Sequence, residues 1–348
     1  MESYGIEIDV GHRTEISRVP LGLFSFDFAL GSKSGKIGIP LRTMIEIAGK
    51  NHVGKSTFSY YMAGILASLD TNDGEIEICD LEGLDVDYLR QAIGVSGFKG
   101  KVHLIDSIEK GRIRQHPTML QESVDNLYKK EKTRVALLDS VGAFISNAES
   151  EGDIGEAFMG KRAFNLAQYA RRSVTHLNNK ATPANVIFIN HTHTVLSGHG
   201  NLTAGGDTLK YLAAVRLGLW QQEIVKVKIS EKEDRILGYR VGGQVDKLRY
   251  GGKGKKFSLV IVPEYGVSKE LTALYDAADL GLIDRGSVVK VDGKSLGYIS
   301  KLFEIAVDGN KTKFDPIFEK LEKYKEEHVL GNTGIYEGDD DTTQDTTG

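Results

Sequence analysis

The sequence predicts an α/β protein with a mixed, mainly parallel sheet and a small C-terminal α/β domain. Three features of its hydrophobic pattern support this fold class. Apolar strands alternate with amphipathic helices up to about residue 208, which is typical of parallel strands covered on both faces. Strands then follow one another without long helices, as in an antiparallel extension of the sheet. Short helices occupy residues 266–330.

The individual elements follow in chain order. The first strands are predicted at 44–48, 75–80, 102–105, 134–139 and 185–190. The helices between them are predicted at 56–69, 85–93, 117–130 and 161–179. Later strands are predicted at 215–222, 238–250 and 257–262, and later helices at 271–279 and 316–325. We therefore divide the chain into an entry segment at 1–42, a core at 43–265, a small domain at 266–330 and an acidic tail at 331–348 that we expect to be disordered.

The composition is that of a globular protein, with 40% hydrophobic and 26% charged residues. The net charge of −4 gives no global basic field, so a nucleic acid would have to meet a local basic surface. The single cysteine, Cys79, excludes a disulfide within the chain and fits a reducing compartment. The first residues do not resemble a signal peptide, and the longest apolar run, at 58–69, is too short to cross a bilayer. We therefore expect a cytoplasmic protein with no membrane partner.

Residues 49–56 fit the phosphate-binding P-loop pattern G-x-x-x-x-G-K-[ST], between a predicted strand and a predicted helix. Its glycines let backbone N–H groups point at an anion, and the helix N-terminus adds the positive end of its dipole. Lys55 is expected to reach the β- and γ-phosphates of ATP, and the Ser56 hydroxyl to ligate Mg²⁺. An ordinary glycine-rich turn would not explain both flanking elements. The predicted nucleotide-binding residues here are Gly49, Lys50, Asn51, His52, Val53, Gly54, Lys55, Ser56 and Thr57.

Two carboxylates follow neighbouring strands of the predicted sheet. Glu82 comes just after the strand 75–80, where an acid would face the γ-phosphate and could orient and deprotonate the attacking water. On spacing alone, Glu82 could also be a surface acid. The strand 134–139 ends in Asp139 after four apolar residues, which is the pattern of a Walker B strand. Ser56 and Asp139 are therefore the predicted metal-binding pair, with Glu82 and Lys55 as catalytic residues.

Several segments resemble the RecA/RadA recombinase family, over nearly the whole chain. Residues 80–85 are similar to the family's D-A-E strand end, and residues 138–141 to its V-D-S-V. Residues 151–160 look like its first DNA-binding loop and are the most specific marker. Residues 187–190 and 205–211 are similar to the segments before and after its second DNA-binding loop. The resemblance implies a RecA-type P-loop ATPase core with a small C-terminal domain.

The resemblance also assigns residues to nucleotide and DNA. Tyr88 falls where the family stacks an aromatic side chain on adenine, with Asp85 beside it among the nucleotide-binding residues. The two DNA-binding loops would span about 147–160 and 192–206, with Met159 as a wedge between base triplets. The implied DNA-binding residues are Gly155, Met159, Gly160, Lys161, Arg162, Arg171, Arg172, His193, Gly205 and Gly206. Without the resemblance, the cations among them would be interpreted as a solvated helix face.

Two further assignments concern catalysis. Lys247 and Arg249 fall where the family's cations reach across to the ATP of a neighbouring subunit, and would neutralise charge on the transferring phosphoryl group. Asn190-His191 replaces the family's usual Asn-Gln pair at the γ-phosphate sensor. His191 can still donate a hydrogen bond, and we expect the coupling of ATP to DNA to vary with pH between about 6 and 7.5. A zinc site formed by His191, His193 and His199 is the weaker alternative.

The implied function is that of a DNA-dependent ATPase, which converts ATP to ADP and phosphate. It would form a homo-oligomeric helical filament on single-stranded DNA and exchange strands with duplex DNA. The host would be a bacterial or a phage-infected cell, since Asn190-His191 suggests a divergent, phage-encoded branch. Residues 4–10 alternate like an edge strand that could join a neighbour's sheet, and the acidic tail would repel duplex DNA. The alternatives are a RecA-fold mediator without strand exchange and a hexameric helicase, which residues 151–160 disfavour.

Overall fold

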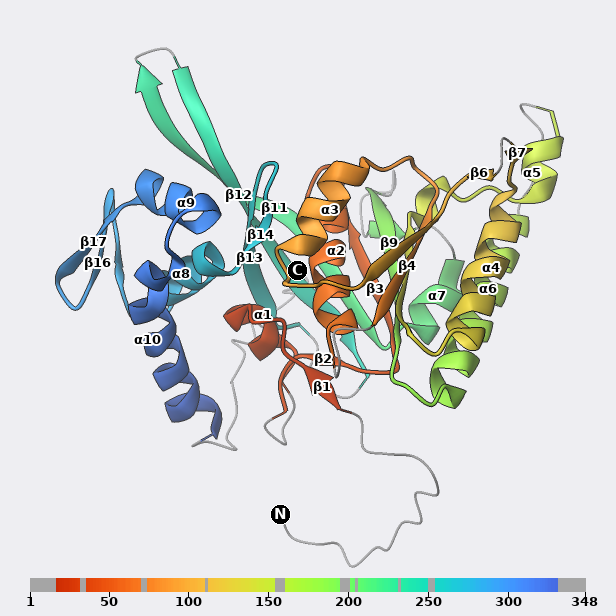
Figure 1. Ribbon diagram of the computed structural model, residues 1–348, viewed down its shortest axis with the longest axis horizontal. Coiled ribbons are helices and arrows are strands. Elements are labelled where there is room, and N and C mark those ends of the chain that lie inside the picture. The colour runs from red at the N-terminus through yellow and green to blue at the C-terminus, as the bar shows by residue number, and fades with distance from the viewer. Residues whose placement is uncertain are drawn as a thin grey trace, which may run out of the picture.

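The computed structural model describes residues 17–31, 36–69, 74–109, 112–153, 160–194, 201–203, 206–230, 233–249 and 254–330. A ten-stranded sheet runs through the molecule in the order β14-β13-β12-β11-β3-β9-β8-β4-β5, and β10 (Asn201–Thr203) pairs with β9 (Figure 1). The parallel part comprises β3 (Met44–Gly49), β9 (Asn185–Thr194), β8 (Thr133–Asp139), β4 (Glu75–Asp80) and β5 (Lys101–Ile105).

The other half of the sheet is mainly antiparallel. β11 (Val215–Ser230) lies parallel to β3 and antiparallel to β12 (Glu233–Leu248). β13 (Lys256–Val262) and β14 (Gly266–Ser268) extend it in antiparallel order. This confirms the antiparallel extension that the sequence predicts. β11 and β12 run eight and five residues beyond their predicted ends, to Ser230 and from Glu233. They project from the body as a two-stranded arm, whose pairing includes the exposed ion pair Lys226–Asp234.

Helices cover both faces of the parallel part. α2 (Lys55–Ala67) and α3 (Val86–Gly94) lie on one face. α4 (His116–Lys129), α6 (Lys161–Asn179) and α7 (Gly206–Leu212) lie on the other. The alternation of side chains along each strand divides the core accordingly, because Ile45 and Ile47 of β3 pack with α2 whereas Met44 packs with α4 and α6. α2, α3, α4 and α6 lie close to their predicted positions, whereas α7 was not predicted.

Small elements complete the core. β1 (Arg18–Val19) pairs with β2 (Ile39–Pro40), and α1 (Phe24–Ala29) lies between them in sequence. The hairpin of β6 (Ile108–Glu109) and β7 (Arg112–Ile113) precedes α4, and the short helix α5 (Asn147–Glu151) follows β8. Within the described ranges, no helix combines the length and the apolar content that crossing a bilayer requires.

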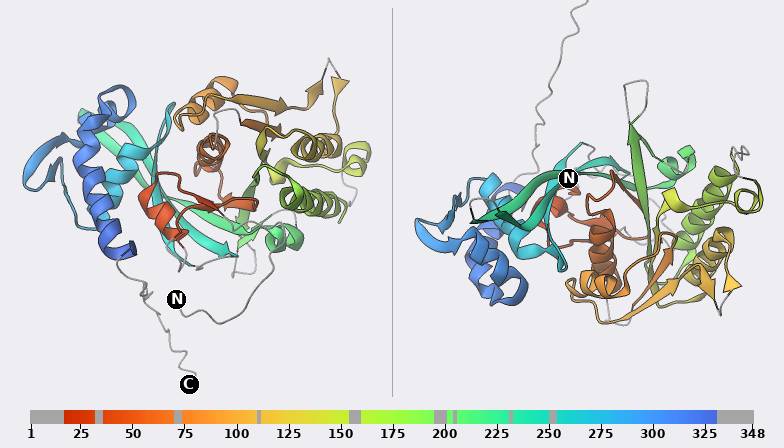
Figure 2. Two further views of the ribbon diagram at one scale, coloured as in Figure 1. Left: turned by 60° about the horizontal axis from the view of Figure 1, so that its bottom comes forward. Right: turned by 90° about the horizontal axis from the view of Figure 1, so that it is seen from above.

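The C-terminal elements build a small α/β unit with its own hydrophobic cluster. α8 (Lys269–Asp279) is followed by the antiparallel strands β15 (Asp284–Arg285), β16 (Val288–Val291) and β17 (Lys294–Tyr298). α9 (Ile299–Asp308) and α10 (Asp315–Lys325) complete the unit. Its cluster includes Val260 and Val262 of β13, so the unit packs against the antiparallel part of the sheet. It lies at the opposite end of the molecule from α4 and α6 (Figure 2).

Candidate nucleotide site and adjoining loops

The P-loop connects β3 to α2 at the carboxyl end of the parallel strands. Gly54 adopts a left-handed backbone with φ of 86° and is the N-cap of α2, where no side chain caps the helix. The first N–H groups of α2 are therefore available to an anion. A Cβ atom at Gly54 would lie 2.2 Å from Cδ1 of Ile261, and one at Gly49 would lie 2.7 Å from the Leu219 carbonyl oxygen. Gly49 is required by the nearby backbone of β11, and Gly54 by its left-handed φ.

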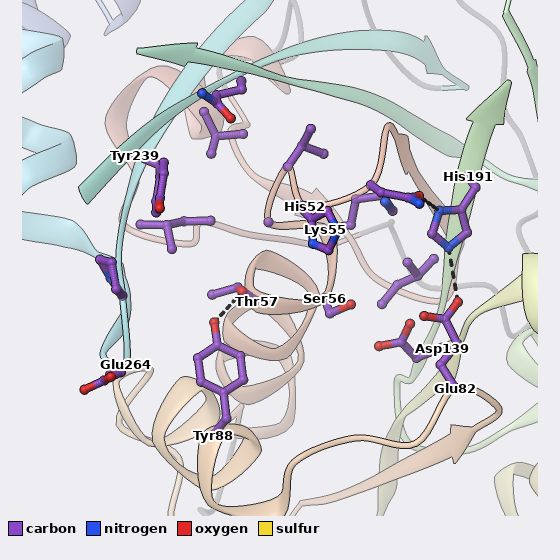
Figure 3. Close-up of a pocket in the computed structure, with 18 residues that line it drawn as sticks. His52, Lys55, Ser56, Thr57, Glu82, Tyr88, Asp139, His191, Tyr239 and Glu264 are labelled. Atoms are coloured by element: carbon purple, nitrogen blue, oxygen red, sulfur yellow. Dashed lines mark hydrogen bonds and ion pairs between the residues drawn. The ribbon is translucent and has the colours of Figure 1, made fainter. Parts of the chain in front are cut away.

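A cavity of about 660 Å³ lies over this loop. Its lining combines the P-loop with side chains from β8, β9, α3 and the antiparallel strands (Figure 3). The lining residues are Asn51, His52, Val53, Gly54, Lys55, Ser56, Thr57, Glu82, Tyr88, Asp139, Ile189, His191, Gln221, Tyr239, Val241, Ile261, Pro263 and Glu264. The structure thus brings most of the predicted nucleotide, metal and catalytic residues to one place.

Lys55 is buried at the floor of the cavity. Its ammonium donates to the carbonyl of Lys50 at 2.8 Å, within the P-loop itself. Burial lowers the pKa of Lys55, while the negative charges of Glu82 and Asp139 oppose this shift. A phosphate in the loop would offer the ammonium an anionic acceptor and strengthen its hydrogen bonding.

Glu82 is held at the end of β4 by the turn that follows the strand. The Asp80 carboxylate accepts the backbone N–H groups of Glu82, Gly83 and Leu84 at 2.9–3.1 Å, and Gly83 takes a positive φ of 83°. Asp80 lies opposite Asp139 in the register of the neighbouring strands β4 and β8, which places Glu82 above the end of β8. The sequence identified Glu82 without showing that Asp80 fixes the turn that presents it.

A chain of hydrogen bonds links Glu82 to the P-loop through His191. Ser140 Oγ donates to Glu82 Oε1, and His191 Nε2 lies 3.1 Å from the same oxygen. His191 Nδ1 lies 2.7 Å from Oδ1 of Asn51. Burial raises the pKa of the Glu82 carboxyl, but the hydrogen bonds from Ser140 and His191 and the charge of Lys55 outweigh it, so the pKa lies below its usual range. Glu82 is therefore ionised at neutral pH.

The two ring nitrogens of His191 thus face two oxygen acceptors. The doubly protonated imidazolium donates to both, whereas the neutral ring has only one N–H to donate. The position of the imidazole ring also depends on Gly142, because a Cβ atom there would lie 2.8 Å from Cδ2 of His191. Among the described residues, no group of three or more His, Cys, Asp or Glu side chains is placed to hold a metal. His199 lies outside those residues, so the zinc alternative stays untested there.

Asp139 ends β8 beside α2. Its Oδ2 accepts the hydroxyl of Tyr60 at 2.8 Å, and the Ser56 hydroxyl also donates to this carboxylate. Burial raises the pKa of Asp139 above its usual range, although both hydrogen bonds act in the opposite direction. Ser56 and Asp139, the predicted metal pair, are therefore in contact.

Tyr88 reaches the cavity from α3. Its hydroxyl lies 2.5 Å from Oγ1 of Thr57, and Asp85 caps α3 by accepting the N–H groups of Asp87 and Tyr88. Asp85 caps the helix that carries Tyr88 but is not among the lining residues. A contact between Asp85 and the nucleotide therefore stays a prediction. Gly49 and Lys50 are likewise not among the lining residues.

The opposite wall of the cavity was not found from the sequence. It consists of Gln221 on β11, Tyr239 and Val241 on β12, and Ile261 and the turn Pro263–Glu264 at β13. Nothing in the local pattern distinguishes these residues from other strand residues. The sequence does predict the antiparallel strands. Their place beside the P-loop, however, follows only from the order of β12 and β13 in the sheet.

The donor set fits a nucleoside triphosphate with Mg²⁺. An uncapped helix N-terminus, a buried ammonium, two adjacent hydroxyls and a buried carboxylate converge on a loop in which two glycines cannot be replaced without a clash. Ser56 and Asp139 supply the oxygen ligands that Mg²⁺ prefers, and phosphates and water would complete its shell.

The comparisons with known proteins agree with this geometry. A family model described as the RecA N-terminal domain matches residues 6–266, three quarters of the chain. The chain belongs to the RecA family. Protein RecA of Desulforapulum autotrophicum is 30% identical over 288 residues, 81% of this chain and 77% of the relative. Protein RecA of Nocardia farcinica is 30% identical over 290 residues, which cover 82% of this chain and 77% of the relative. Protein RecA of Helicobacter hepaticus is 28% identical over 315 residues, which cover 89% of this chain and 84% of the relative.

This RecA-family chain carries the ends of its two predicted DNA-binding loops side by side. Gly160 caps α6 with a φ of 88°, and Gly206 begins α7 with a φ of 73°. A Cβ atom at Gly206 would lie 3.4 Å from Cβ of Ala163 on α6, so the two loop ends meet. β9 continues past His191 into the second loop and pairs with β10. Gly155, Met159 and Gly205 lie outside the described residues. The predicted edge strand at 4–10 and the acidic tail also lie outside them.

The predicted DNA-binding cations of α6 differ in their surroundings. Arg162 forms an ion pair with Glu149 of α5 at 2.5 Å, which ties the base of the first loop to α6. Arg172 donates to Gln121 and pairs with Asp125 of α4. Arg171 is exposed, as is Lys161 at the start of α6. Phosphate contacts by Arg162 and Arg172 would have to replace these existing pairs, and all four roles stay predictions.

Lys247 and Arg249 do not line the cavity of their own chain. Lys247 Nζ donates to the carbonyls of Lys210 and Tyr211 at 2.8 Å, and Arg249 Nη2 reaches the carbonyls of Tyr211 and Leu212. Both cations therefore cap the C-terminus of α7, the helix that follows the second loop. A catalytic role for them would require the cavity of another copy, as the prediction states.

Proposed function

We propose that this protein is a DNA-dependent ATPase of the RecA type that coats single-stranded DNA and promotes pairing and strand exchange with a duplex. One observation carries most weight. His191 contacts both the P-loop, through Asn51, and the predicted base Glu82, and it lies on β9, which runs directly into the second predicted DNA-binding loop. A ligand at the γ-phosphate position and a ligand on the loop would therefore act on the same strand.

In the proposed hydrolysis, water attacks the γ-phosphorus of ATP and the bond to the β,γ-bridging oxygen breaks, giving ADP and phosphate. Glu82 orients the water and takes its proton, since its carboxylate is ionised and partly open to solvent. Lys55 and the N–H groups at the start of α2 neutralise charge on the phosphates. When bound, Mg²⁺ draws charge from the β- and γ-oxygens. Ser56 and Asp139 would hold it.

The proposed coupling runs along β9. A γ-phosphate oxygen would compete for the imidazole N–H groups that now face Asn51 and Glu82. Movement of His191 would shift the start of the second loop, and DNA that orders the loop would in turn bias His191. The adjacent loop ends at Gly160 and Gly206 support one shared nucleic-acid strand.

Assembly would complete the site. Lys247 and Arg249, which cap α7 at the far end of the second loop, would contact the ATP of the neighbouring copy in a helical filament. DNA affinity would fall steeply with salt, because phosphate contacts release counterions.

Electron microscopy with single-stranded DNA and a non-hydrolysable ATP analogue tests this proposal. We expect helical filaments that require both ligands. A closed ring would support a helicase instead, and no assembly would support a mediator that binds ATP without coating DNA. Either outcome would overturn the proposal.

A further inference from the structure

Two tyrosines stand next to each other in α2, and each uses its hydroxyl differently. Tyr60 is 3% exposed, and its hydroxyl donates to Oδ2 of Asp139 at 2.8 Å. Tyr61 is fully buried, and its hydroxyl donates to the carbonyl of Leu21 at 2.8 Å. Tyr60 follows Ser56 by one helical turn, so both side chains leave α2 toward the end of β8. Asp139 thus receives hydroxyl groups from two successive turns of the same helix.

We propose that Tyr60 is a positioning residue that fixes the Asp139 carboxylate for binding of Mg²⁺. A phenylalanine would fill the same space, so packing alone does not account for the hydroxyl, which would be costly to bury without an acceptor. Its hydrogen bond occupies Oδ2 and restricts rotation of the carboxylate, which lines the cavity. Because Asp139 is only 6% exposed, solvent could not readily supply a substitute donor.

The inference rests on the proposed function, since it takes Ser56 and Asp139 as the metal-binding pair. Partners that orient the groups around a metal commonly contribute about tenfold or more to metal affinity. Tyr60 would contribute in this way without touching the nucleotide, because it is not among the residues that line the cavity. Tyr60→Phe should therefore weaken the part of nucleotide binding that depends on Mg²⁺ and leave the remainder intact.

Tyr61→Phe is the matched control. It removes the same atom from the neighbouring position of the same helix and leaves another buried acceptor, the Leu21 carbonyl, without its donor. Its effect on the free energy of unfolding should be comparable, because each variant leaves one buried acceptor without its donor. Its hydroxyl bonds to Leu21 and not to Asp139, so the Mg²⁺ dependence should remain that of the wild type.

The experiment measures the dissociation constant of a fluorescent, non-hydrolysable ATP analogue on the full chain, in EDTA and across a Mg²⁺ titration. For Tyr60→Phe we expect the gain in affinity on adding Mg²⁺ to fall roughly tenfold, with unchanged binding in EDTA. Tyr61→Phe should match the wild type. An unchanged Mg²⁺ gain in folded Tyr60→Phe, or an equal loss in Tyr61→Phe, would overturn the proposal.

A double-mutant cycle with Asp139→Asn keeps the result independent of folding defects. If Tyr60 acts through Asp139, Tyr60→Phe should add little to the loss that Asp139→Asn already causes. An undiminished Tyr60→Phe effect in that background would show that Tyr60 acts by another route. If instead the wild type gained no affinity from Mg²⁺ at all, the proposed function itself would be at fault.

Discussion

The two walls of the nucleotide cavity are built in different ways. The wall from the parallel strands carries Glu82, Asp139 and His191, and each is held by hydrogen bonds from within the chain. The wall from the antiparallel strands presents the aliphatic side chains of Val241 and Ile261 together with Tyr239, Gln221 and Glu264. We infer that the first wall performs the chemistry with groups held by hydrogen bonds, and that the second wall mainly shapes the space for the nucleotide. Substitutions on the first wall should affect hydrolysis, and those on the second should affect binding.

The largest expected effect lies outside both walls and sharpens the comparison. Lys247→Ala combined with Arg249→Ala should lower DNA-stimulated ATP hydrolysis on the order of 10³-fold, as removal of a cation supplied by a neighbour does. Nucleotide binding to the isolated chain should persist, because neither residue lines its cavity. Steady-state phosphate release and analogue binding would measure both. Hydrolysis within tenfold of the wild type would contradict the assignment.

Glu82→Gln tests the parallel wall itself. The amide cannot accept the proton of the attacking water, so hydrolysis should fall on the order of 10²-fold or more while nucleotide binding is retained. Mixing this variant with the Lys247→Ala, Arg249→Ala chain adds a sharper readout. Composite sites with Glu82 from one chain and cations from the other should restore part of the activity. A mixture no more active than its components would argue against a shared site.

Tyr239→Ala tests the antiparallel wall. Loss of aromatic surface should weaken binding of the ATP analogue roughly tenfold, in line with about 1–2 kcal/mol for a partly buried ring. The rate at saturating ATP should remain near that of the wild type, because Tyr239 lies on the opposite side of the cavity from Glu82 and His191. Tyr298→Ala, at an exposed tyrosine of β17 far from the cavity, is the control. A fall in the saturated rate without loss of affinity would break the division between the walls.

The smallest effect concerns pH. The pKa of Glu82 is held below its usual range, so its carboxylate stays ionised and cannot titrate between pH 6 and 7.5. Burial raises the pKa of the Asp27 and Asp276 carboxyls to about 7, so those groups also titrate in that window. The part that belongs to His191, which contacts Glu82 and Asn51, is the part that its substitution removes. The predicted variation of ATP–DNA coupling between about pH 6 and 7.5 should therefore be smaller in His191→Gln than in the wild type, measured as DNA-stimulated hydrolysis across that range. A flat wild-type profile would reject this role.

The same two walls show how far sequence reasoning reaches. The P-loop, Glu82 and Asp139 could be predicted because each stands at a fixed offset from a strand end, so local spacing carries the information. Tyr60 could not, because its contact with Asp139 depends on which face of α2 meets β8. The antiparallel wall could not be predicted because it depends on how β12 and β13 turn back beside the P-loop. The cap of α7 by Lys247 and Arg249 depends on contact between segments that are distant in the sequence. The hairpin arm was underestimated although Val225-Lys226-Val227-Lys228-Ile229 alternates between apolar and charged residues, which is typical of a strand.

The most direct test of the central claim measures two couplings in one preparation. ATP hydrolysis is followed with and without a single-stranded oligonucleotide, and binding of that oligonucleotide is followed with and without the ATP analogue. We expect the oligonucleotide to accelerate hydrolysis and the analogue to tighten oligonucleotide binding, because β9 carries His191 at the cavity and continues into the second predicted DNA-binding loop. Equal hydrolysis and equal binding in all four conditions would contradict it.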